Sequence, residues 1–202
     1  MSILLFSYIF PFLLTVLLLQ RAAAFSGRDL RGWGAAMVFG FAGAGIVLMP
    51  VGGLPIGRWL ISFNANFSIP LSAILFSKVF ESFFGMRLLD EKALRTGWMF
   101  SILAGAVLYP MAMGLGRWDP YAAGWGFSWL FILAFLVTVA LLAMRNRFAG
   151  VLVAAILACD LHLLESANFW DYLIDPILVA VSCIALGKWI VRRRAQAPMH
   201  KT

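Results

Sequence analysis

Charged side chains are scarce in this sequence. Lysine, arginine, aspartate and glutamate make up 12% of the 202 residues, and 63% of the residues are hydrophobic. An ordinary soluble domain has about 25% charged residues, and a soluble chain of this size could not bury so much apolar surface. The composition therefore argues against a soluble protein and predicts an integral membrane protein, because a bilayer acts as the solvent for apolar side chains.

Cysteine and histidine are also rare. The two cysteines, Cys159 and Cys183, lie in apolar stretches, so we expect buried free thiols and no disulfide. Of the two histidines, only His162 lies outside the C-terminal tail. Carboxylate-bridged metal sites in helical bundles usually take two Glu-x-x-His pairs, and the sequence offers one such pair, in reversed order. We therefore expect no metal and no cofactor.

Long apolar stretches dominate the rest of the chain. A transmembrane helix needs about 20 mostly apolar residues, and such a segment is helical in lipid because a helix satisfies its own backbone hydrogen bonds. The sequence predicts an all-α bundle of seven transmembrane helices as a single domain at 1–191, followed by a basic cytoplasmic tail at 192–202. The predicted spans are Ile3–Leu19, Trp33–Val51, Asn66–Phe84, Gly97–Leu115, Phe127–Met144, Phe148–Leu164 and Ile177–Val191.

The first stretch has an alternative interpretation. The small residues Ala22, Ala23 and Ala24 after it resemble the cleavage site of a signal peptide. No positive residue precedes the apolar run, however, and Arg21 follows it directly. These features favour a retained helix that enters the membrane from outside.

The distribution of lysine and arginine predicts the orientation, because cytoplasmic loops carry an excess of both. With the N-terminus outside and the C-terminus in the cytoplasm, 13 of the 16 basic residues are cytoplasmic. Arg58 and Arg117 then lie outside, and Lys78 lies within a span. The net charge of +7 is thus a topology signal, which attracts anionic lipid rather than nucleic acid. Short loops and this bias indicate a bacterial inner membrane.

Small residues form one face of the second predicted span. Spacings of three and four place Ala36, Gly40, Gly43 and Ala44 together. Such faces let helices approach closely in lipid, so we expect this face to pack against another helix. A close-approach surface for a ligand or partner is the alternative.

Two ionisable residues fall inside the third predicted span. Lys78 and Glu81 are three residues apart and share a helix face. Each would cost roughly 2.5–3.5 kcal/mol in the bilayer if unpaired. We therefore expect an intramembrane ion pair, with a proton or ion relay as the alternative.

The most polar outward stretch runs from Asp160 to Pro176. On a continuous helix, His162, Glu165 and Ser166 share a face and Asp160 points elsewhere. His162 with Glu165 is a candidate acid/base pair, with Asp160 as a third candidate catalytic residue. The alternative is hydrogen bonding in the headgroup region, with Asp175 capping the helix that begins at Pro176.

Arg58 and Arg117 are the only outward cations, and a tryptophan follows each. Arginine binds phosphate with two parallel hydrogen bonds. They therefore form a candidate site for a lipid phosphate, together with Trp170 and Asp171, or they order the outer loops by pairing with aspartates.

Three functions follow from these features. The favoured one is a non-catalytic accessory subunit that packs against a larger membrane-protein partner or forms a homo-oligomer. The second is an intramembrane enzyme or lipid-binding protein that uses His162, Glu165, Arg58 and Arg117. The third and weakest is a proton-coupled carrier that uses Lys78, Glu81 and Asp160.

Overall fold

The structure is a computed structural model that describes residues 6–28 and 30–196. These residues form an all-helical protein in which each predicted span overlaps one helix: α2 (Ile9–Phe25), α3 (Gly32–Leu48), α5 (Ile69–Phe84), α6 (Glu91–Ala112), α7 (Trp129–Ala143), α8 (Phe148–Asp160) and α10 (Pro176–Gln196). Residues 3–5 of the first span and 197–202 of the tail lie outside the described residues.

Shorter elements connect these helices. A two-residue hairpin of β1 (Pro50–Val51) and β2 (Leu54–Pro55) leads into α4 (Ile56–Phe63), and the 3-10 helix η1 (Pro120–Gly124) and α9 (Phe169–Leu173) lie between longer helices. The second predicted span is three residues too long, because α3 ends at Leu48, just before Pro50. The predicted start of the tail, from Arg192, is instead the last turn of α10.

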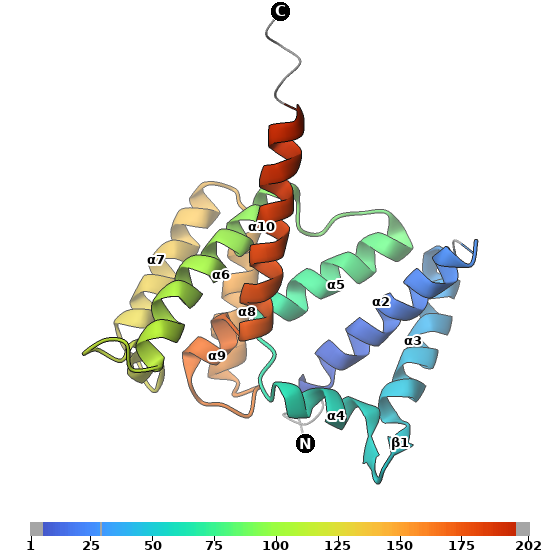
Figure 1. Cartoon of the computed structure of the whole chain (residues 1–202), viewed down its shortest axis with the longest axis horizontal. Coiled ribbons are helices and arrows are strands. Elements are labelled where there is room, and N and C mark those ends of the chain that lie inside the picture. Colours follow the sequence, from blue (N-terminus) through green and yellow to red (C-terminus); the bar gives the residue numbers. More distant parts are fainter. Residues whose placement is uncertain (1–5, 29, 197–202) are drawn as a thin grey trace, which may run out of the picture.

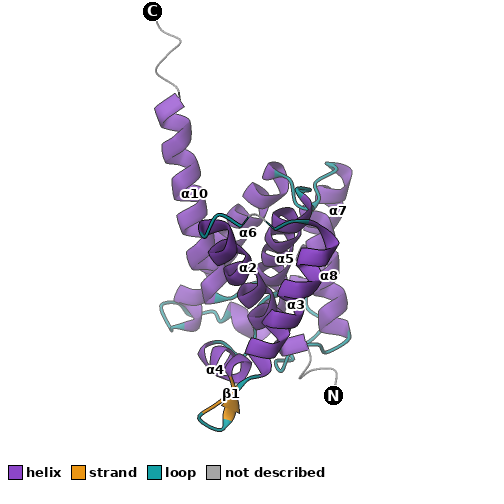
Figure 2. Ribbon diagram, turned by 90° about the vertical axis from the view of Figure 1, so that its right-hand side faces the viewer, coloured by secondary structure: helices purple, strands orange, loops and turns teal. Residues whose placement is uncertain are grey.

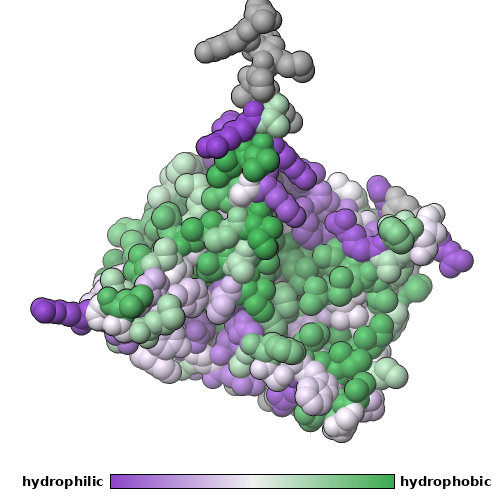
Figure 3. All heavy atoms as spheres, in the orientation of Figure 1, coloured by the Kyte–Doolittle hydropathy of each residue, from purple (hydrophilic) through white to green (hydrophobic). Residues whose placement is uncertain are grey.

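Among the described segments, one is both long and apolar enough on its own to cross a membrane. It is Phe169–Ala195, which comprises α9 and α10. Four further helices, α2, α3, α7 and α8, are apolar but only 10–17 residues long. Much of the surface visible in Figure 3 is hydrophobic.

The helices form two groups (Figure 1). In one, α2 packs on α3 and α5; in the other, α7 packs on α8, and α6 packs along α10. Contacts of α5 with α8 and α9 join the groups. The far end of α10 extends beyond the other helices (Figure 2).

The core is centred on α8. Phe148, Leu152 and Ala155 of this helix are fully buried. The ring of Phe148 lies where a side chain at Gly97 would be, so the glycine lets α6 approach α8 closely. Both cysteines are free, but Cys183 is exposed on α10 in this chain, so the expectation that it is buried in the protein is wrong.

Asp175 links the two helix groups at one end of the molecule. Its Oδ2 accepts hydrogen bonds from the Ser68 backbone N–H at 3.0 Å and from the Ser68 hydroxyl at 2.5 Å. Its Oδ1 accepts from the backbone N–H of Leu178 at 2.9 Å, which is the expected cap of α10. Ser68 is the N-cap of α5. One carboxylate therefore fixes the starts of two helices from different groups.

Replacing Asp175 with alanine tests this link. Asp175 is 3% exposed, and Ser68 is fully buried, so the change leaves buried donors without acceptors. We expect a loss of about 3 kcal/mol of unfolding free energy, measured by thermal unfolding in mild detergent. The control is Asp119→Ala, which removes the exposed cap of η1 and should cost under about 1 kcal/mol. Equal losses in the two variants would contradict the link.

Candidate functional site

The polar residues predicted on the outer side hold loops together. The Tyr121 hydroxyl donates to Asp171 Oδ2 at 2.9 Å, and Trp170 Nε1 donates to the Pro120 carbonyl at 2.8 Å. Asn168 Nδ2 donates to the Tyr121 carbonyl at 2.9 Å. Burial, together with the negative charge of Asp171, raises the pKa of Tyr121 to about 12. Tyr121 therefore remains a hydrogen-bond donor at neutral pH, and α9 is fixed to η1.

His162 does not lie on a helix. Helix α8 ends at Asp160, and His162 has a left-handed backbone with φ of 51°. The His162 N–H bonds to the Cys159 carbonyl and the Leu163 N–H to the Ala158 carbonyl, which is the Schellman ending usually made by glycine. The expectation that His162, Glu165 and Ser166 share one helix face is therefore wrong.

The predicted acid/base residues have other partners. The His162 ring nitrogen Nδ1 is 2.9 Å from the carbonyl oxygen of Asp160, and Glu165 Oε1 is 4.0 Å from Arg58 Nη1. The Ser166 hydroxyl accepts from the Asn168 N–H at 3.0 Å. Within residues 6–28 and 30–196, no group of three or more His, Cys, Asp or Glu is placed to hold a metal ion.

A cavity of about 300 Å³ lies where α6, η1 and the start of α10 meet. Its polar lining includes Tyr109, Tyr121, Asp171 and Asp175. Of the residues predicted to bind a phosphate, Asp171 lines the cavity, while Arg58, Arg117 and the buried Trp170 are not among its described lining residues. A cavity lined by two carboxylates repels phosphate, so its electrostatics do not suit that ligand.

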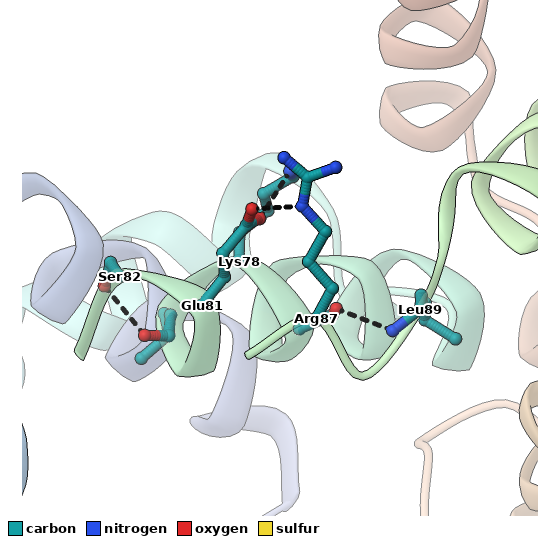
Figure 4. Close-up of polar contacts among 7 residues, drawn as sticks. Lys78, Glu81, Ser82, Arg87 and Leu89 are labelled. Carbon is teal, nitrogen blue, oxygen red and sulfur yellow. Dashed lines mark hydrogen bonds and ion pairs between the residues drawn. The ribbon is translucent and has the colours of Figure 1, made fainter. Parts of the chain in front are cut away.

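A second polar cluster lies at the other end of α5 (Figure 4). Lys78 Nζ is 2.9 Å from Glu81 Oε2, and Arg87 Nε reaches Glu81 Oε1. The sequence predicted the first pair from its spacing, but it did not predict Arg87, which comes from the loop after α5. The Ser77 hydroxyl accepts from the Leu89 N–H at 3.1 Å and holds this loop in place.

The small-residue face of α3 packs partly inside the chain. A side chain at Gly43 would lie 2.7 Å from Val16 of α2, and Ala36 packs beside a cluster that includes Val16 and Phe83. Gly40 has nothing within 4 Å of a Cβ atom, and Ala44 is half-buried. Gly43 is therefore the residue that allows α2 and α3 to approach closely.

Fold and sites together define an all-helical protein with one clear membrane-spanning segment and polar clusters at its two ends. Comparisons with protein-family models, with curated proteins and with solved structures found no match to this chain.

Removing the charge of Glu81 tests the cluster of Lys78, Glu81 and Arg87. An unpaired lysine costs roughly 2.5–3.5 kcal/mol at the centre of a membrane helix, and less here because the Lys78 side chain is 40% exposed. We expect Glu81→Gln to lower the unfolding free energy by about 1–2 kcal/mol, measured in mixed micelles, and Lys78→Gln added to it to restore most of the loss. Glu91→Gln breaks an exposed pair with Arg95 and should cost under about 0.5 kcal/mol. A double variant no more stable than Glu81→Gln would contradict the pairing.

Proposed function

We propose that the protein is a multi-pass membrane protein with seven spans, its N-terminus outside and its C-terminus in the cytoplasm of a bacterial inner membrane. We further propose that it is a non-catalytic accessory subunit that packs against a larger membrane-protein partner. The observation that carries the proposal is that its helices are apolar on exposed faces as well as buried ones.

Helix α7 supports the placement in lipid most directly. Its buried side chains form one stripe of Leu130, Ala134, Thr138 and Leu141. Its exposed side chains are also apolar, with Phe135 at 60% and Leu136 at 57% exposure. A surface helix of a soluble protein carries polar residues on its outer face, so the apolar outer face of α7 suits contact with lipid or with another membrane helix.

Helix α8 is short for a span, with 13 residues, or about 20 Å at 1.5 Å per residue. It contacts α5, α6, α7 and α9 on one face, whereas Val153 and Leu157 on its other face are exposed. A bilayer accommodates a short span of this kind by thinning locally.

The proposed orientation is supported by the positions of the basic loops. The α2–α3, α5–α6 and α7–α8 connections lie at the end of the bundle toward which α10 runs (Figure 1). Arg28, Arg87 and Arg145 belong to these three connections, and α10 ends with Arg193 and Arg194 in its last turn. A positive end of this kind faces the cytoplasm.

A non-catalytic role is supported by the engagement of the outer polar groups. Asp175 caps a helix, Asp171 accepts from Tyr121, and the His162 ring contacts its own backbone. Each of these groups stabilises a turn or a helix end.

Helix α3 offers the surface for a partner. It buries only Gly43 and Val47 among its 17 residues. Side chains at Gly34 and Gly45 would meet nothing within 4 Å, and these two glycines lie three turns apart on the exposed face. The exposed Val38 and Phe41 lie between these glycines on the same face, and the glycines give a helix of another protein room to approach on either side of them.

The topology is tested by labelling single cysteines. In a chain with Cys159→Ala and Cys183→Ala, the variant Ala122→Cys lies in η1 and Met86→Cys lies in the α5–α6 loop. In bacterial spheroplasts we expect an impermeant maleimide to label Ala122→Cys, and to label Met86→Cys only after lysis. Labelling of both cysteines before lysis, or the reverse pattern, would contradict the proposed topology.

The partner face is tested by a pair of glycine variants. Gly45→Leu extends into open space, whereas Gly43→Leu meets Val16. We expect Gly45→Leu to keep its melting temperature but to lose a stoichiometric partner on co-purification, and Gly43→Leu to lower the melting temperature. Retention of the partner by Gly45→Leu would contradict the proposed face. If only a second copy of this chain co-purifies, the proposal of a larger membrane-protein partner is contradicted.

A further inference from the structure

An apolar crevice lies between the two helix groups. It has a volume of about 590 Å³ and is lined by side chains of α2, α4, α5, α6 and α10, among them Leu14, Ile74 and Val181. Lys78 is the one charged residue in its described lining. Figure 3 shows hydrophobic surface beside α10, with hydrophilic atoms above it.

A basic cavity of about 470 Å³ continues from the crevice. Lys78, Trp98 and Ala185 line both hollows, so the two are contiguous. The basic cavity is also lined by Arg87, Lys188, Arg192 and Arg193, and its only described acidic lining residue is Glu91. The apolar crevice therefore ends at a concentration of positive charge.

Two of these cations have no protein partner. Lys188 and Arg192 make no hydrogen bond or ion pair within the described part of the chain. Glu91, by contrast, accepts from Trp189 Nε1 at 3.1 Å, and Arg193 lies 4.9 Å from the centre of the Trp189 ring. The acidic residue is thus engaged, and Lys188 and Arg192 are available to an anion.

The size of the crevice argues against a helix as its occupant. A four-turn helix about 10 Å across has a volume of about 1,700 Å³, which is larger than the crevice. A lipid chain is far thinner. From Ile177 to Ala185 the lining of the crevice follows α10 for eight residues, about 12 Å at 1.5 Å per residue, so the crevice runs lengthwise as an acyl chain does.

We propose that the crevice and the basic cavity together bind one anionic phospholipid of the cytoplasmic leaflet. An acyl chain lies between α2, α5 and α10, and the phosphate contacts Lys188 and Arg192, with Lys78 and Trp98 at the junction. Lysine and arginine near a membrane surface attract anionic lipid, and arginine adds paired hydrogen bonds to phosphate. The inference rests on the proposed membrane placement, which the cysteine labelling tests separately.

The test is a lipid titration followed by native mass spectrometry of the full chain in mild detergent. Phosphatidylglycerol and phosphatidylcholine with the same acyl chains are compared, because they differ in net charge. We expect one phosphatidylglycerol to bind at least tenfold more tightly than phosphatidylcholine. Lys188→Gln with Arg192→Gln should weaken phosphatidylglycerol binding about tenfold and leave phosphatidylcholine unchanged. The matched control is Arg28→Gln with Arg145→Gln, which removes the same charge from exposed residues outside both hollows.

Blocking the crevice tests the position of the acyl chain. Val181→Trp fills the crevice. Ile184→Trp introduces the same side chain at an exposed position of α10 that does not line the crevice. We expect only Val181→Trp to reduce the binding of both lipids, with the melting temperatures of the two variants similar. The proposal would be overturned if the Lys188/Arg192 variant and the Arg28/Arg145 control lost phosphatidylglycerol binding equally. It would also be overturned if Val181→Trp and Ile184→Trp lost lipid binding equally. Binding of glycerol phosphate as tight as that of phosphatidylglycerol would also overturn it, because a free anion would then suffice.

Discussion

The arrangement of the whole molecule depends on the hydrogen bonds between Asp175 and Ser68. Contacts between the two helix groups are few compared with those inside each group. The carboxylate bridges them where α5 and α10 begin, and both residues are buried. Because a buried carboxylate without donors is costly, the two helix starts must remain together. From that point α5 and α10 diverge, and the crevice lies between them.

The helices could be predicted because each long apolar stretch lacks polar side chains to satisfy its backbone, and a helix satisfies the backbone hydrogen bonds within the stretch itself. The ends of the helices depend on local chemistry that hydropathy does not contain. Pro50 and Asp175-Pro176 are visible signals, and α3 and α10 end and begin there. The end of α8 carries no such signal, because His162 occupies the left-handed position usually taken by glycine. For that reason a continuous helical face was wrongly expected from His162 to Ser166.

Candidate site residues were predictable where both partners lie on one helix. Lys78 and Glu81 are three residues apart, and helical geometry alone brings them together. Arg87 joins them from a loop, and Arg58 reaches Glu165 from more than 100 positions away in the sequence. Such pairs depend on the path of the chain between elements. The crevice was not predicted either, because a hollow between helices results from how far they diverge, which hydropathy does not encode.

The two ends of the molecule differ in how their charges are balanced. At the end where α10 begins, carboxylates accept from backbone N–H groups and hydroxyls, so these aspartates stabilise loops without needing cations. At the end where α10 finishes, cations outnumber carboxylates, and Lys188 and Arg192 have no partner in the described chain. Positive charges held close together repel one another unless an anion lies between them. This end is therefore electrostatically incomplete in the isolated chain. An anionic headgroup beside Lys188 and Arg192 would complete it, and the apolar crevice below would hold the attached chain.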